Sequence, residues 1–308
     1  MSGRSTRSSY EEKMARFLQG ERLVIQTPPW NGLRQVREAQ RAVAANALRR
    51  RDPRDPGADK ARARLERKHA LALRKAFAKT VRVIVPPRST ARTLTAEAVV
   101  GRLRERQGIL RAAIVAMLTD AVLLGAAHGW EDVEGRMGIR TNAVLGITWD
   151  LIHQAALAWV VSGNGPAGLP DWGMGYDGAD ELVAQVVRTS EAQLRPLVGV
   201  WIQEGAPLPT LITRMEAVTF SRERAKVIAV TEVTRAYALG NILAWQQGGV
   251  ITRNRWETAA DELVCPICRP LAGSTAQVGR QFQSEEGNLV NPPPAHPSCR
   301  CWLTAVVE

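Results

Sequence analysis

The sequence predicts a mainly α protein, in which a multi-helix body precedes a small α+β module at the C-terminus. Three observations support this prediction. Between residues 95 and 247, apolar side chains recur mostly at three- and four-residue steps, the period of a buried helix face. After Gly248-Gly249, two short stretches have the alternation or the β-branched composition of strands. All four cysteines of the chain fall between residues 265 and 301.

Residues 1–92 are predicted to form a basic helical N-terminal region that is partly disordered. The first nine residues are small, polar and basic, and three helical stretches follow at 10–25, 32–51 and 58–83. The apolar stripes of these helices are narrow, and their other faces are charged. Such helices are better suited to packing on a partner, or to lying against nucleic acid, than to forming a compact core.

Residues 93–218 are predicted to form the helical body. Thr95 is a candidate N-cap, with Glu97 in the first turn of a long helix that runs to about residue 127. Further helices are expected at 141–161, 181–202 and 209–215. A loop rich in Gly and Pro is expected at 162–178.

Residues 219–308 are predicted to form a separate module. Its helix covers 220–247, capped by Ser221 and ended by Gly248-Gly249. Strands are expected at 251–258 and 302–307, in a small hairpin or sheet. The segment between the cysteine pairs, rich in Gly, Ser, Gln and Asn, is expected to be an irregular loop.

Five potential metal ligands lie within the cysteine-rich segment: Cys265, Cys268, His296, Cys299 and Cys301. A tetrahedral zinc site takes four thiolate or imidazole ligands, and close pairs allow one turn to present two of them. We therefore predict a structural zinc that clamps the module, with the omitted ligand undecided. Reduced thiols without metal and two disulfides are the alternatives, although disulfides require an oxidising compartment.

A structural metal is favoured over a catalytic one. Zinc deaminases pair Cys-x-x-Cys with an upstream His-x-Glu, which is missing from this sequence. Asp261 and Glu262 precede the first cysteine and could serve a hydrolytic site. Glu232 is a third candidate, but an ion pair with Arg235 three residues later is the favoured interpretation. The prediction is a protein without enzymatic activity, with a metal-dependent hydrolase as the alternative.

The charge of the chain is unevenly distributed. The net charge is +11 overall, which divides into +16 over residues 1–104 and −5 over the remainder. An anionic partner is therefore expected for the first part only, with solvated helix faces as the alternative. Residues 1–22 lack the apolar stretch of a secretory signal. The most apolar run, 109–127, contains Arg111 and Asp120, and we interpret it as a core helix without a membrane partner.

The C-terminal third resembles a known family through an ordered set of motifs. The set consists of Ser221-Arg222-x-Arg224-Ala225-x-x-Ile228-Ala229-x-Thr231-Glu232, Gly240-Asn241, Gly249-Val250, Trp256, Asp261, Cys265-Pro266-Ile267-Cys268, Leu271-x-Gly273 and Pro294-Ala295-His296-Pro297-x-Cys299-Arg300-Cys301. In this order, the motifs resemble the head morphogenesis domain of tailed-phage minor head proteins, the phage Mu F-like family. The resemblance covers roughly residues 205–308. Val230 departs from it, because the family commonly has Arg before Thr-Glu.

The resemblance implies a virion component of a tailed bacteriophage or prophage. Such minor capsid proteins act in procapsid and head assembly, which takes place in the host cytoplasm. The expected partners are the portal protein, at whose vertex they associate, and capsid or scaffold components. Contact with packaged double-stranded DNA through the basic N-terminal third is a further expectation. A zinc-containing DNA-binding protein that acts independently of the capsid is the alternative.

Overall fold

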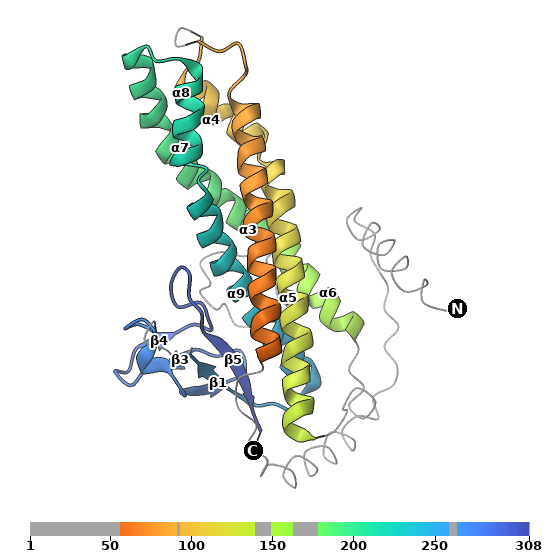
Figure 1. The fold of residues 1–308 in the computed structure, drawn as a ribbon. Helices are drawn as coiled ribbons and strands as arrows, with labels where there is room; N and C mark the ends of the chain where they lie inside the picture. Colours follow the sequence, from red (N-terminus) through yellow and green to blue (C-terminus); the bar gives the residue numbers. More distant parts are fainter. Residues whose placement is uncertain (1–55, 91–92, 139–148, 163–177, 259–263, 308) are drawn as a thin grey trace, which may run out of the picture.

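The computed structural model describes residues 56–90, 93–138, 149–162, 178–258 and 264–307. Within these ranges the chain forms a long helical bundle with a small β module at one end (Figure 1). The predicted fold class is therefore confirmed. In chain order the helices are α3 (Pro56–Ile84), α4 (Ala96–Glu105), α5 (Gly108–Met137), α6 (Trp149–Ser162), α7 (Gly178–Glu204), α8 (Leu208–Ala217) and α9 (Arg222–Gly248). They are followed by β1 (Arg253–Glu257), the 3₁₀ helix η2 (Arg269–Leu271), β2 (Thr275–Gln277), β3 (Phe282–Gln283), β4 (Leu289–Val290) and β5 (Trp302–Val306).

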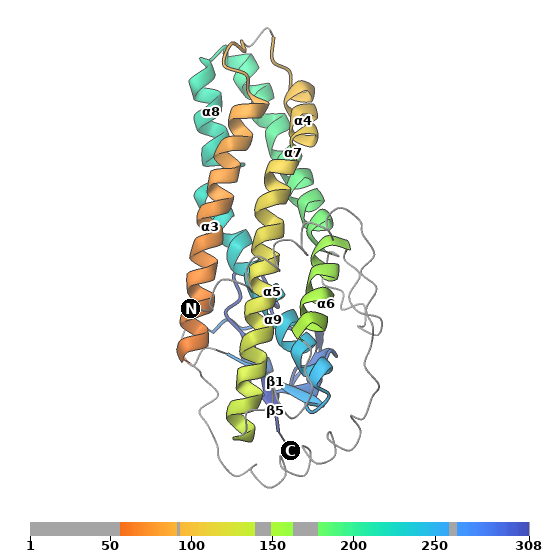
Figure 2. The same cartoon turned by 90° about the vertical axis from the view of Figure 1, so that its right-hand side faces the viewer.

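Helices α3, α5 and α9 pack against one another, and α5 and α9 do so most extensively. Helix α3 runs alongside α5 at one edge of the bundle (Figure 2). Glycines allow this close approach: a Cβ on Gly125 would overlap the backbone of Tyr237, and one on Gly240 would overlap the Val122 carbonyl. The indole Nε1 of Trp245 on α9 also donates a 2.8 Å hydrogen bond to the Gly129 carbonyl of α5. The α5–α9 pair is thus fixed by backbone proximity as well as by apolar packing.

The expected helix boundaries are confirmed where capping residues mark them. The Thr95 side chain accepts a hydrogen bond from the Ala98 amide, and Ser221 accepts one from the Arg224 amide. Gly249 ends α9 in the left-handed conformation at φ 64°, which a residue without Cβ adopts at little cost.

The prediction of a single helix from residue 95 to about 127 is wrong, because α4 and α5 are separate helices. Arg106, at ψ 11°, leaves the helical conformation, and α5 begins again at Gly108. Glycine near this point lowers helix propensity. The break also lets α4 pack on α7, an arrangement that local periodicity cannot reveal.

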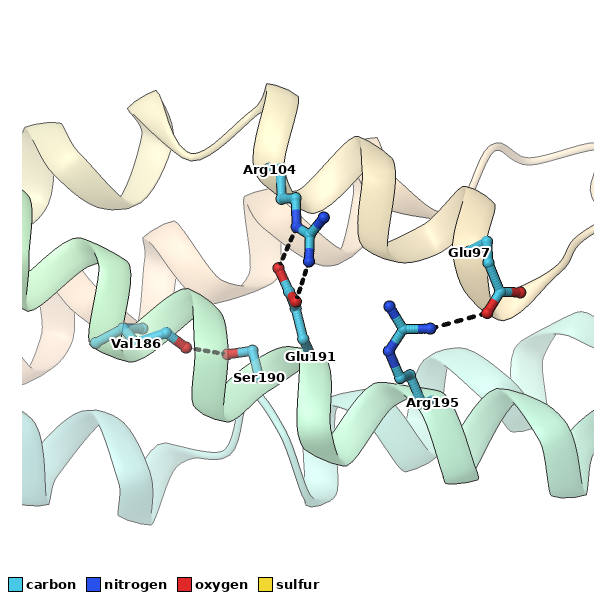
Figure 3. A network of polar contacts seen from close by, with 6 residues as sticks. All are labelled: Glu97, Arg104, Val186, Ser190, Glu191 and Arg195. Carbon is cyan, nitrogen blue, oxygen red and sulfur yellow. Dashed lines mark hydrogen bonds and ion pairs between the residues drawn. The ribbon is translucent and has the colours of Figure 1, made fainter.

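Two ion pairs join α4 to α7 (Figure 3). Arg104 contacts both carboxylate oxygens of Glu191 at 2.6 Å, and Arg195 contacts Glu97 at 2.8 Å. Arg104 lowers the pKa of Glu191, mainly through these hydrogen bonds. Because three of the four side chains are exposed, the pairs orient α4 more than they stabilise it.

Helix α3 corrects the expectation that the basic N-terminal helices would not contribute to a compact core. Leu73, Phe77, Val81 and Ile84 are almost fully buried, against α5, α9 and neighbouring helices. The narrow apolar stripe suffices because the chain itself supplies the partner surface. The division into segments at 92 and 218 remains a prediction.

The C-terminal module contains more regular structure than expected. Strand β1 lies between β2 and β5 in an antiparallel sheet, which confirms the two predicted strands. The segment expected to be an irregular loop contains β2 and the β3–β4 hairpin, which is a correction. These strands are only two or three residues long, too short to show periodicity. Trp256 packs edge-on against Phe282, with ring centroids 5.3 Å apart, and joins the two sheets.

Two segments of the chain are unusually apolar, which bears on the expectation of a core helix at 109–127. The segments Gly108–Met137 and Leu208–Gly248 are long and apolar enough to cross a membrane by length and composition alone. In their most apolar stretches, 44% of the first segment and 78% of the second are buried inside the protein. Helix α5 buries twelve residues in the core, as expected of a core helix. The helices expected before residue 55, the start of the helix expected at 141–161, and most of the loop expected at 162–178 lie outside the described residues.

Candidate metal centre

Two short loops of the C-terminal module bring the five predicted ligands together. Cys265 and Cys268 lie on the turn before η2, where the Cys268 and Arg269 amides both donate to the Cys265 carbonyl, at 3.2 and 3.0 Å. The Cys268 amide also lies 3.3 Å from the Cys265 sulfur, an N–H···S contact that orients the Cys265 side chain. This turn presents both sulfurs on the same side.

The second loop carries His296, Cys299 and Cys301. The Cys299 amide donates to the His296 carbonyl at 3.2 Å, which closes a tight turn. Ser298 within it has a φ of 59°, a left-handed conformation that is uncommon for residues other than glycine. On a straight strand, the side chains of Cys299 and Cys301 would lie too far apart to bind one ion. The turn precedes β5, so neither cysteine belongs to a strand.

The ligand atoms form two overlapping groups that share Cys268. The imidazole Nε2 of His296 lies 3.0 Å from the Cys265 sulfur and 3.2 Å from the Cys268 sulfur. The Cys268 sulfur lies 3.7 Å from that of Cys299. Within each group, Cys265–Cys268–His296 and Cys268–Cys299–Cys301, all ligand atoms lie within 4.8 Å of one another. Cys268 is therefore the centre of the cluster.

The hydrogen bonds of His296 leave Nε2 available as a ligand. Its Nδ1 lies 2.8 Å from the Pro297 carbonyl, which can only accept, so Nδ1 carries the proton. The lone pair of Nε2 then points at two sulfur atoms. A cation between them would satisfy all three groups, and a backbone acceptor on the other ring nitrogen is the usual support of a metal-bound histidine.

The thiols of Cys268, Cys299 and Cys301 lie close enough to affect one another's ionisation. Hydrogen bonding with Cys299 raises the pKa of Cys268, whereas hydrogen bonds from Cys268 and Cys301 lower the pKa of Cys299. Three thiolates so close together cannot all be ionised unless positive charge compensates for them. A bound divalent cation deprotonates its thiol ligands and provides that charge.

The donor set fits zinc. Tetrahedral ligands with Zn–S bonds of about 2.3 Å place two sulfurs about 3.8 Å apart, close to the 3.7 Å between Cys268 and Cys299. All four cysteines are free thiols in the structure. A surface cleft lined by Cys265, Cys268, His296 and Cys301 gives an ion a path of entry. The identity of the ion and the choice among the five ligands remain predictions.

Side chains of the helical bundle hold the second loop, and sequence reasoning did not find them. Thr231 of α9 accepts a hydrogen bond from the Ser298 amide at 2.9 Å, and Thr234 donates to the Cys299 carbonyl at 3.2 Å. Arg62 of α3 donates to the carbonyls of Arg300 and Cys301, both at 3.3 Å. The two threonines are three residues apart, on one helix face, which is a detectable signal. Arg62 has no such signal, because its acceptors lie more than 230 residues away.

Of the three acidic residues considered for catalysis, the structure describes only Glu232. Glu232 is buried and pairs with Arg235 at 3.0 Å, as the favoured interpretation predicted. Its carboxylate therefore serves an ion pair on α9. Asp261 and Glu262 lie outside the described residues.

The comparisons with known proteins concern this same part of the chain. Residues 194–304 match the family described as phage Mu protein F like protein. The match begins within α7 and includes α8, α9, the β module and all five candidate ligands. It confirms the resemblance seen in the motif order, over about a third of the chain. No curated protein matches the chain significantly. No solved structure does so either.

Proposed function

We propose that this protein is a minor head protein of a tailed bacteriophage or prophage, acting in procapsid and head assembly at the portal vertex. The observation that carries the proposal is the family match over residues 194–304. Its motif residues that the structure describes lie on α9, on β1 and on the two loops that carry the candidate ligands. In this proposal the protein assembles in the host cytoplasm and ends in the virion, with portal and capsid or scaffold proteins as partners.

Within this function, the proposed role of the Cys/His cluster is structural. Cys268 and Cys299 are buried, and the cluster ties η2 to the start of β5 across a segment of about thirty residues. A zinc ion bound by four of the five ligands would supply folding free energy to strands too short to be stable alone. The ion pair between Glu232 and Arg235 also supports a structural rather than a catalytic role for this carboxylate.

The assembly role is tested by locating the protein. Mass spectrometry of virions purified from cells that carry this gene should detect it at a small fraction of the major capsid protein. Co-purification with the portal protein should persist at high salt. Absence from virions, together with no retention on the portal, would contradict the proposal.

A stripe on α3 supports contact with DNA as part of this function. Among the described side chains of α3, all the exposed ones except Leu71 are basic. The basic stripe consists of Lys60, Arg64, Arg67, Lys68, Arg74, Lys75, Lys79 and Arg82. Within the described part of the chain only Lys68 has an ion-pair partner, Asp120. At about 1.5 Å per residue the stripe is about 33 Å long, close to one turn of duplex DNA.

We expect the basic stripe to bind duplex DNA without sequence preference, because phosphate neutralisation is independent of base identity. Replacing Arg64, Arg67 and Arg74 with Gln should make the slope of log K against log[salt] shallower by about 2–3. The matched control replaces three exposed basic residues elsewhere, Arg222, Lys226 and Arg280, and should change the slope much less. Equal effects of the two triple variants would argue against a specific role for the stripe.

The alternative, a DNA-binding protein independent of the capsid, rests on the same stripe. The two functions predict that the protein is retained on different binding partners. Retention on the portal at high salt supports the assembly role. Retention only on DNA, at low salt and with no protein in virions, supports the alternative.

A further inference from the structure

The metal-binding loop is held by the helical bundle at each of four consecutive residues. The Ser298 amide donates to Thr231, and the Cys299 carbonyl accepts from Thr234. The next two carbonyls both accept from Arg62, Nη2 for Arg300 and Nη1 for Cys301. Two of these carbonyls belong to candidate metal ligands. A change in the position of the loop is therefore transmitted directly to Arg62.

Arg62 is fixed from every side by described residues. It is 8% exposed, and its Nε lies 3.7 Å from the Glu66 carboxylate. Its guanidinium carbon lies 5.7 Å from the ring centroid of Tyr237 on α9 and 6.0 Å from that of Trp302 on β5. Three parts of the fold, α3, α9 and the start of β5, thus meet at one side chain. A buried cation is costly unless such partners remain in place.

We propose that metal binding at the Cys/His cluster and docking of the first turns of α3 are coupled through Arg62, which acts as a positioning residue for the metal loop. This inference rests on the metal centre of the proposed function. The ion fixes the side chains of Cys299 or Cys301, and thereby the carbonyls that Arg62 binds. Arg62 in turn holds those carbonyls, and with them the ligands, in the geometry that the ion requires.

Coupling of this kind is reciprocal. If docking of α3 raises the affinity for metal by some factor, metal binding favours docking of α3 by the same factor. The positive charge of Arg62 contributes as well, because three thiolates and one imidazole around Zn²⁺ carry a net charge of −1. Outer residues that support metal ligands typically change metal affinity by about 10- to 100-fold when they are replaced.

The first test uses the unmodified full chain. Hydrogen–deuterium exchange is measured with zinc and with a chelator in excess. We expect chelation to speed amide exchange in the first turns of α3, around residues 62–66, and to leave the last turns, around residues 78–84, unchanged. Unchanged exchange at 62–66 upon loss of bound metal would overturn the inference, and no substitution is needed to obtain that result.

The second test measures Co²⁺ affinity, with the thiolate-to-metal charge-transfer band as the signal. Arg62→Ala should weaken binding about 10- to 100-fold. Arg62→Lys keeps the charge but cannot reach two carbonyls in fork geometry, so it should recover only part of the affinity. Arg222→Ala, which removes an exposed arginine of α9 outside the metal loop and the basic stripe, is the matched control and should bind Co²⁺ as the unmodified chain does.

The outcomes separate this inference from the proposed function. If Arg62→Ala folds and binds Co²⁺ with unchanged affinity and spectrum, the coupling is wrong, while a role in head assembly is unaffected. If the unmodified chain binds no metal, the coupling is wrong together with the metal centre, and virion mass spectrometry still tests the assembly role. Weaker Co²⁺ binding by Arg62→Ala, with metal-dependent exchange at residues 62–66, supports the inference.

Discussion

Cys268 differs from the other candidate ligands because both ligand groups contain it. Its sulfur contacts the His296 imidazole on one side and the Cys299 sulfur on the other. It is also buried, whereas Cys265 and His296 are partly accessible. Replacing Cys268 thus removes a donor from every arrangement of ligands that the structure allows. Replacing Cys301 leaves the Cys265–Cys268–His296 group complete.

We therefore predict that Cys268→Ser reduces zinc affinity by more than 100-fold and lowers the melting temperature of the C-terminal module. Cys301→Ser is the comparison, and its effect on affinity should be smaller. Metal content after gel filtration and competition with a coloured chelator measure the difference. Stoichiometric zinc of unchanged affinity in Cys268→Ser would contradict the assignment.

The surroundings of Asp120 lead to a prediction about how stability depends on pH. Its carboxylate accepts a hydrogen bond from the buried His69 at 3.1 Å and another from Lys68. Hydrogen bonding with His69, followed by that with Lys68, lowers the pKa of Asp120 below its ordinary value. A lowered pKa in the folded state means that Asp120 stabilises the fold above its ordinary pKa. That contribution is lost as the pH falls through the lowered value.

We predict that Asp120→Asn is less stable than the unmodified protein near neutral pH, and that the difference disappears in acid. Urea unfolding followed from pH 7 down to pH 2 measures it. The two curves should converge below about pH 4, the ordinary range of aspartate. A constant difference in unfolding free energy across this pH range would show that the charge of Asp120 does not contribute to stability.

At the level of elements, the α5–α9 contact is the feature on which the bundle depends. The carbonyl of Val122 lies where a Cβ of Gly240 would be, and Tyr237 similarly faces Gly125. Replacing a glycine inside a helix with alanine normally favours the helix by about 1 kcal/mol. Here the backbone of the other helix occupies the space, and backbone cannot rotate away as a side chain does. The steric overlap therefore outweighs the gain in helix propensity, and the substitution should lower the stability of the protein.

We predict that Gly240→Ala destabilises the protein by about 1–3 kcal/mol, the usual cost of overpacking a core. Gly199→Ala in α7 is the matched control. A Cβ there would meet no atom within 4 Å, so this variant should be neutral or slightly more stable. Chemical unfolding of both variants measures the contrast, and an equally stable Gly240→Ala would show that α5 and α9 can move apart cheaply.

At the level of the whole molecule, the bundle and the β module have different sources of stability. The bundle buries a large apolar core that includes Trp130, Trp201 and Trp245. The β module adds residues such as Trp256 and Leu303 to the same core, but its strands are short. Polar contacts, such as that of the Ala305 amide with Asp132 at 2.9 Å, also attach it to the bundle. Metal binding should consequently matter far more to the module than to the helices.

We predict that a chelator loosens residues 265–301 and leaves the helical circular dichroism signal nearly unchanged. Trypsin should then cleave faster after Arg280 and Arg300. Free zinc at 100 times its dissociation constant should stabilise the module by about 2.7 kcal/mol relative to the metal-free protein. Loss of the helical signal upon chelation would show that the metal stabilises the bundle as well.

The sequence by itself determined the features with local physical causes. Apolar periodicity indicated most helices, and the caps at Thr95, Ser221 and Gly249 marked their ends. The spacing of the cysteines indicated five candidate ligands, which the structure brings together in two overlapping groups. Motif order indicated the family that residues 194–304 match. Each of these signals lies within a few consecutive turns, or in the identity of the residues themselves.

Only the tertiary structure decided the features that depend on contacts between distant residues. It separated α4 from α5, since packing on α7 outweighs the continuity of the helical pattern. It brought α3 into the core and left its basic stripe outside. It placed Arg62 on two carbonyls near the other end of the chain, where no spacing rule could predict it. The physical reason is that helix periodicity and metal-ligand spacing are short-range properties, whereas burial and hydrogen-bond partners depend on which surfaces the folded chain brings together.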